Sequence, residues 1–276
     1  MTHQVSITTI LTLIVTAEGC SKPHNHVMPP ATSSPVTISV NTPKYFRWTL
    51  ASKPHSVSFQ IADSSIVSVN TDTTKKELPF ISNSIYGLSV VPGSPPHIRL
   101  HIDSTSDGNK ELDLTAIVSP HGQVTDLQAI HSASCRGGIN PRFVRLFDLF
   151  ASPPSTSIAA GSHWTDTSIV VVCHGRTPLR QQIIHSYTLI GESSWRERHI
   201  LEIQRVTQIE IGEVQVDSQN PVTAKGSGAG LATLLIDPES GLVLQSSGTS
   251  DLSLSVITSR GMFPFRQHGV TSIIAQ

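Results

Sequence analysis

The stretch GSHWTDTSIVVVC, residues 161–173, divides this 276-residue chain into two halves. It begins where an irregular, proline-rich connector ends, and it runs into the apolar, β-branched residues that are typical of a strand. It finishes on Cys173, one of three cysteines in the chain. We therefore expect this stretch to start the second half of a β-rich fold.

His163 and Asp166 within this stretch could join a serine in a hydrolytic site. A structural interpretation is favoured, in which Trp164 fills a core position and Asp166 bonds the local backbone. The chain contains no H-E-x-x-H, G-x-S-x-G or C-x-x-C motif. The sequence thus predicts a protein that is not an enzyme, with no catalytic residue, no metal site and no cofactor.

The composition favours short strands joined by many turns. Charged residues make up 14% of the chain and aromatic residues 5%, while glycine and proline number 18 each. The formal net charge is −1, so the chain has no basic field that would hold phosphates. Nucleic acid is therefore not an expected partner.

Alternating apolar and polar residues predict strands about ten residues apart, each followed by a turn signal. This spacing favours a mainly β fold: a curved antiparallel sheet or open half-barrel built from two similar halves, with a short amphipathic helix packed on it. The predicted strands cover residues 36–40, 45–50, 57–61, 66–69, 85–91, 97–102, 112–118, 124–130, 169–173, 182–189, 199–206, 209–216, 229–236, 242–245 and 252–257. A final segment, 262–265, leads to a weak strand at 270–275.

Two features suggest how the halves are built. Residues 115–124 and 233–243 both read as a strand, a Ser-Pro or Asp-Pro turn, a glycine and a second strand, which favours an internal duplication. The glycine-rich run 226–230 precedes a strand and lacks the Lys-Ser/Thr of a phosphate loop. It indicates a bend or bulge where the sheet curls.

One helix is expected over residues 142–150. Asn140 and Pro141 supply an N-cap and a proline at the first helical position. The apolar residues recur at helical spacing and form one face, which must cover part of the sheet. If the helix acts as a plug or lid over a ligand, the residues that cover the ligand are expected to be Phe143, Leu146, Phe147 and Phe150.

The first 35 residues form a separate unit. Residues 1–19 contain an apolar run too short to span a bilayer and are predicted to be a signal peptide. Cys20 follows a glycine, as in the lipobox of bacterial lipoproteins, so we expect a lipid anchor there, with plain secretion as the alternative. Residues 20–35 carry four prolines and are predicted to be a disordered tether.

Cys135 and Cys173 are the two cysteines of the folded part. In an exported chain they are expected to form a disulfide, worth roughly 3–4 kcal/mol by the chain-entropy estimate. A redox-active pair or metal thiolates are the alternatives, but redox pairs are normally close in sequence and metal sites need more ligands.

The combination of these features resembles a family of uncharacterised bacterial exported β-rich proteins, many of them lipoproteins. The shared features are Cys135 before a short helix, the G-x-x-W-x-D-T segment, Cys173, G-x-G-x-G and the strand-Asp-Pro-x-x-Gly hairpin. They cover roughly residues 45–257. More loosely, the layout is similar to the lipoprotein-carrier (LolA/LppX-like) half-barrel fold, and this resemblance implies a concave apolar site for acyl chains.

We expect one structural domain. A first β half (residues 36–130) precedes the helix and connector (131–160), and a second β half (161–276) follows. The favoured function is a non-enzymatic lipoprotein of the bacterial envelope, anchored in the outer membrane, that binds a lipid or other apolar ligand. A sheet that closes on a side-chain-filled core, with no cavity of about 300 Å³ or more, would contradict this function. The alternatives are a structural or assembly protein of the envelope and, less favoured, a hydrolase.

Overall fold

The chain forms one open, mainly β structure. The computed structural model describes residues 55–70, 75–91, 93, 97–103, 112–118, 124–130, 138–152, 154, 156–174, 177–213, 223–258 and 261–276. Predicted strands 36–40 and 45–50, the signal peptide and the tether lie outside these residues. The strands are β1 (His55–Asn70), β2 (Lys75–Val91), β3 (His97–Asp103), β4 (Leu112–Val118), β5 (Val124–Ile130), β6 (His163–His174), β7 (Thr177–Trp195), β8 (Arg198–Glu213), β9 (Thr223–Ile236), β10 (Val243–Thr258) and β11 (Gly261–Ala275).

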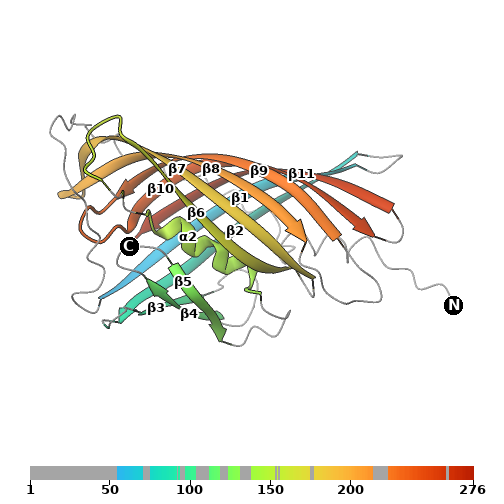
Figure 1. Cartoon of the computed structure of the whole chain (residues 1–276), viewed down its shortest axis with the longest axis horizontal. Coiled ribbons are helices and arrows are strands. Elements are labelled where there is room, and N and C mark those ends of the chain that lie inside the picture. The colour runs from blue at the N-terminus through green and yellow to red at the C-terminus, as the bar shows by residue number, and fades with distance from the viewer. Residues whose placement is uncertain are drawn as a thin grey trace.

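Among the described residues, all eleven strands belong to one sheet in the order β5-β4-β3-β2-β1-β11-β10-β9-β8-β7-β6, with β5 and β6 as its two outermost strands. Every neighbouring pair is antiparallel. The sheet is strongly curved, and its long strands arch over the helical segment (Figure 1). The mainly β, open antiparallel fold expected from the sequence is confirmed.

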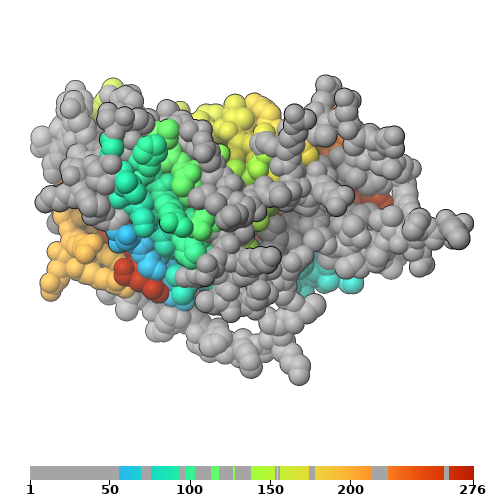
Figure 2. Space-filling model, turned by 90° about the horizontal axis from the view of Figure 1, so that it is seen from below, coloured from blue at the N-terminus to red at the C-terminus, as the bar shows by residue number. Residues whose placement is uncertain are grey.

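The strands before the helix and the strands after it form two contiguous parts of the sheet. They join where β1 pairs with β11, with Phe59 opposite Ala275. Figure 2 shows this junction from below, where the red end of β11 lies against the blue start of β1. The two segments that resemble each other in sequence link β4 to β5 and β9 to β10, the fourth and fifth strands of each part.

The Asp-Pro-x-x-Gly hairpin between β9 and β10 forms as predicted. Gly241 has a φ of +74°, which a glycine adopts without strain. Its N–H donates to the Asp237 carbonyl at 2.9 Å. The Asp237 carboxylate also accepts hydrogen bonds from the Glu239 N–H and the Ser240 hydroxyl.

Several strands are longer than the sequence predicts, and three of them join segments that were expected to be separate. Segments 57–61 and 66–69 form one strand, β1, and the same fusion produces β8 and β10 from two predicted strands each, while β11 begins before the weak strand expected at 270–275. The polar residues between the segments are not turns. They continue the strand, because their side chains occupy a polar region of the sheet that is described below.

The helical segment begins as a 3-10 helix, η1 (Pro141–Arg145), and continues as the α-helix α2 (Leu146–Leu149). The predicted N-cap is confirmed, since the Asn140 side chain accepts a hydrogen bond from the Arg142 N–H at 2.9 Å. The segment is fixed at both ends. Ile139 forms a parallel bridge with Val172 of β6, and Phe150 forms an antiparallel bridge with Leu242.

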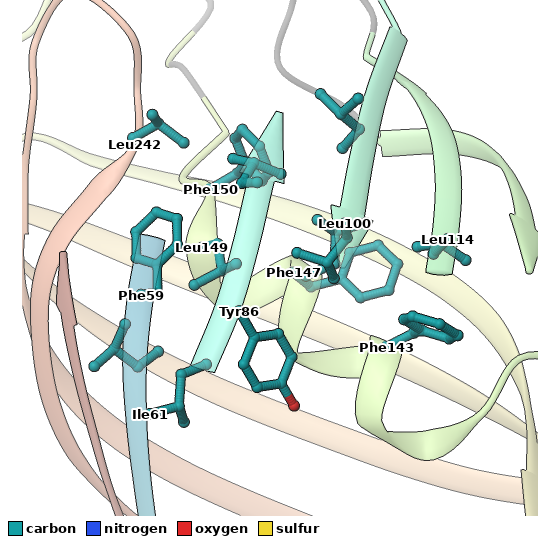
Figure 3. Packing of buried hydrophobic residues seen from close by; sticks show 14 of the residues in the cluster. Phe59, Ile61, Tyr86, Leu100, Leu114, Phe143, Phe147, Leu149, Phe150 and Leu242 are labelled. Atoms are coloured by element: carbon teal, nitrogen blue, oxygen red, sulfur yellow. The ribbon is translucent and has the colours of Figure 1, made fainter. Parts of the chain in front are cut away.

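The largest hydrophobic core lies between the helical segment and the sheet, and both parts of the sheet contribute to it. Phe143, Leu146 and Leu149 have no exposed surface, and they pack with residues of β1 to β4. Figure 3 shows Phe143 and Phe147 of this segment near Leu114 and Leu100. Two smaller cores are also present: one around Tyr187 and Leu234 in the second part of the sheet, and one around Val256 and Phe265 that also includes Val67 of β1.

The glycines of run 226–230 lie inside β9 and form no bulge, because β9 and β10 keep their register from Gly226 to Leu235. The predicted bulge is therefore wrong. Their role is close approach of two backbones: a Cβ on Gly226 would lie 2.4 Å from the Ser253 carbonyl oxygen and 2.9 Å from Leu254 Cδ1.

Gly226→Ala is expected to lower the free energy of unfolding by about 1–3 kcal/mol, because β9 and β10 must separate to admit the new methyl group. Gly212→Ala is the matched control: a Cβ added to this β8 glycine would meet no atom within 4 Å. The control should change stability by less than about 0.5 kcal/mol. Urea unfolding of both variants measures the difference, and equal stabilities would contradict the close approach.

Candidate functional site

A band of polar and small residues crosses the inner face of the sheet, the face that the helical segment covers. It consists of two adjacent cross-strand rows. We call these rows the inner band: Asp63, Thr271, Gly248, Ala232 and Arg205 in the first, and Ser65, Gly269, Ser250, Gly230, Thr207 and His185 in the second.

The inner band separates two apolar regions of the sheet and leaves space above it. Gly230, Ala232 and Gly248 carry no side chain beyond a methyl group, so a cavity of about 240 Å³ remains between them and the helical segment. Its apolar walls include Phe147, Ile183, Ile209, Leu252 and Ile273. The volume is below the roughly 300 Å³ expected from the sequence argument, so this cavity fits only part of a larger ligand.

The helical segment is joined to the inner band by an ionic network. Asp148 accepts hydrogen bonds from Arg205 Nη2 at 2.7 Å and from Arg145 Nη1 at 3.1 Å. Arg145 Nη2 also donates to Asp63 Oδ1 at 2.6 Å and to Thr271 Oγ1 at 3.3 Å. The network thus connects α2 with β8 on one side of the cavity and η1 with β1 and β11 on the other.

These contacts change the acidity of the network's groups. Burial favours the neutral form of Asp148, but the positive charges of Arg205 and Arg145 outweigh it and hold the pKa of Asp148 at about 2. Burial likewise opposes the charge on Arg145, yet Asp63 and Asp148 raise its pKa above the usual value. Both side chains are therefore charged at neutral pH.

His185 borders the same cavity and is almost fully buried, with 3% of its surface exposed. Burial, helped by the nearby positive charge of Arg205, lowers its pKa to about 4. The ring is therefore neutral at pH 7. Its Nδ1 lies 3.0 Å from the Thr207 hydroxyl.

The predicted lid residues occupy the core more than the cavity. Phe143, Leu146 and Phe150 are buried in the largest hydrophobic core, and Phe147 alone of the four lines the cavity. The other face of the segment, with Arg145 and Asp148, contributes the polar wall. Tyr86 adds a further contact, since its hydroxyl donates to the Arg142 carbonyl at 3.3 Å.

The stretch that starts the second half is architectural. Trp164 stacks on Tyr187 with ring centroids 5.3 Å apart, and its Nε1 donates to the Ser152 carbonyl at 2.9 Å. His163 and Asp166 are not brought together. Strand alternation places Asp166 on the inner face beside His185, while His163 bonds the Thr188 hydroxyl on the outer face.

Cys173 is buried in β6, with 2% of its surface exposed. Its N–H donates to the Ile139 carbonyl at 2.8 Å, so the chain that follows Cys135 returns beside it. Cys135 and Cys20 lie outside the described residues, and both the disulfide and the lipid anchor stay predictions. Neither helical segment within the described ranges is long and apolar enough to cross a membrane.

Sequence reasoning did not identify Asp63, His185, Arg205 or Thr271 as site residues. Their signal is present, however: each is a polar residue in an otherwise alternating strand, at a position where alternation calls for an apolar side chain. Without the register of the sheet, nothing shows that these positions meet.

No protein-family model, no curated protein and no solved structure matches this chain. The fold and cavity define a class of architecture, an open antiparallel half-barrel with a fixed helical segment over a partly polar inner cavity.

Proposed function

We propose that this protein is a non-enzymatic lipoprotein of the bacterial envelope that binds a lipid or other apolar ligand on the inner face of its sheet. The cavity of about 240 Å³ between the helical segment and the inner band carries this proposal. Its walls combine apolar side chains with a few polar groups, the usual chemistry of a small-molecule site.

The arrangement also supports a role for the helical segment. Because its ends are bridged to β6 and to the β9–β10 hairpin, and its charged residues are bonded to the sheet, it forms a fixed roof over the cavity. The anchor at Cys20 and the outer-membrane location belong to the same proposal. Native mass spectrometry of the protein purified from its membrane, with lipid extraction, tests both the ligand and the acylation of Cys20.

Ile209→Trp is expected to reduce binding of the uncharged apolar probe N-phenyl-1-naphthylamine at least about tenfold, because the indole would fill the cavity beside β8. Val206→Trp is the control, since Val206 lies on the outer face of the same strand with 41% of its surface exposed. Probe fluorescence measures both. A folded Ile209→Trp variant that binds like the control, or a wild-type protein that binds no apolar probe, would contradict the proposal.

A structural or assembly role is the second candidate, and a specific surface favours it. One cross-strand row on the outer face contains only uncharged, exposed residues over eight strands. The row consists of Ile81, Ser64, Val270, Thr249, Leu231, Val206, Ser186 and Thr165. Exposed apolar surface of this kind is typical of contact with another component. Val206→Glu and Leu231→Glu would abolish such a contact and leave probe binding intact.

A further inference from the structure

Two buried side chains at the cavity have hydrogen-bond donors or acceptors that no described residue satisfies. Arg205, with 6% of its surface exposed, uses Nη2 for Asp148 but leaves Nε and Nη1 without a partner. His185 Nε2 is likewise unpartnered. A buried polar group without a partner is costly, so a ligand that pairs with these groups gains affinity.

The charge distribution favours an anionic acceptor. Asp148 is shared between Arg205 and Arg145, whereas Arg145 has Asp63 as a second carboxylate. Arg205 therefore has only a share of one negative charge within the described structure. Its Nε and Nη1 carry only donor hydrogens, which calls for an acceptor from the ligand.

The histidine fits the same acceptor. When its Nδ1 accepts the Thr207 hydroxyl hydrogen, the neutral ring carries its proton on Nε2 and donates from there. Arg205 and His185 lie on neighbouring strands in adjacent rows of the inner band, and both border the cavity. A head group in the cavity would therefore lie beside both residues.

The apolar side chains that line the cavity indicate where the alkyl chain of such a ligand would lie. On the inner face, Ile183 and Ile209 occupy the cross-strand row next to that of His185 and Thr207. Leu252 lies two residues after Ser250, on the same side of the inner band. Ile209 and Leu252 also pack against the apolar core around Val256 and Phe265. An alkyl chain that starts at the inner band thus has continuous apolar contacts toward that end of the sheet.

We propose that the cavity binds the carboxylate of a fatty acid, with Arg205 and His185 as its hydrogen-bond donors and with the chain running along Ile209 and Leu252. This inference rests on the proposed function and names its ligand class. A singly charged carboxylate suits one incompletely neutralised guanidinium. A phosphate carries more negative charge and would be repelled more strongly by Asp148 and Asp63.

The test is calorimetric titration of the full, delipidated chain with dodecanoate, dodecan-1-ol and dodecyl phosphate. Dodecanoate should bind at least about tenfold more tightly than the alcohol, the ratio that one hydrogen bond to a charged group provides. Arg205→Met should weaken dodecanoate binding by about 10–100-fold and leave dodecan-1-ol within about threefold. His185→Leu, which leaves the ionic network intact, should weaken dodecanoate binding about fivefold to tenfold.

The outcomes separate the two proposals. Equal binding of acid and alcohol by the wild-type protein would overturn the carboxylate site but keep the apolar ligand. Tighter binding of dodecyl phosphate than of dodecanoate would also overturn it, in favour of a phosphate head. If no amphiphile binds, the proposed function itself fails. Circular dichroism checks the fold of Arg205→Met, and the acid-to-alcohol ratio and His185→Leu decide the matter if that variant is unfolded.

Discussion

Asp148→Asn is expected to lower the free energy of unfolding by about 3–5 kcal/mol, the typical cost of removing one partner from a buried ion pair. The substitution keeps the shape of the side chain but leaves Arg205, whose side chain is 7% exposed, without a carboxylate. It also removes one of the two carboxylates of Arg145. Chemical denaturation at pH 7 measures the loss.

A matched control and a double variant sharpen this prediction. Asp251→Asn removes the carboxylate of an exposed pair with His268, whose side chains are 76% and 57% exposed. Such pairs contribute about 1 kcal/mol or less. Combining Asp148→Asn with Arg205→Met should recover part of the loss, because the unpaired buried cation is then gone. If Asp148→Asn costs no more than Asp251→Asn, the network does not hold the helical segment to the sheet.

The strand pattern and the N-cap of the helical segment could be predicted from the sequence, because both depend on local chemistry. Strands β4 and β5 match their predicted ranges, and Asn140 caps the helical segment as expected. The hairpin at Asp237 follows from the same local rules, since proline fixes φ and glycine accepts a positive φ.

Strand continuity could not be predicted, and the errors have one physical cause. Each of the three wrongly divided strands, β1, β8 and β10, is interrupted in the sequence where it crosses the inner band, for example at Asp63 and Ser65 in β1 or at Gly248 and Ser250 in β10. There polar or small residues stand on both faces, and the alternation that marks a strand disappears. The places where the pattern fails are thus the places where the candidate site lies.

The site itself depends on contacts between residues distant in sequence. Arg205 and Asp148 come from β8 and α2, and Asp63 lies near the start of the folded part. The apolar face of the helical segment predicted that it covers the sheet. Only the register of the sheet reveals that its charged face also points inward and closes a cavity.

The free energy of unfolding is expected to fall by about 3 kcal/mol as the pH is lowered from about 6.5 to about 4, because of His185. Burial and Arg205 lower the pKa of this histidine from 6.5 to about 4 in the folded protein, although Asp148 and Asp166 act in the opposite direction. In this range the unfolded chain binds a proton that the folded protein does not bind. Stability is therefore fully present above about pH 6.5 and declines by up to about 1.4 kcal/mol per pH unit below it.

His185→Gln should remove this slope between pH 6.5 and pH 4, since the variant has no group to protonate at that position. His97→Gln, which changes an exposed histidine of β3, should retain it. Protonation of Asp148 lowers the stability separately, at lower pH. The pKa of Asp148 in the folded protein is about 2, below the ordinary 3.8, so its contribution to stability is lost as the pH falls from about 4 through 2. Urea unfolding at half-unit pH steps distinguishes the two groups. An unchanged slope in His185→Gln would mean that burial does not lower the pKa of His185. The inner band would then be open to water at this point.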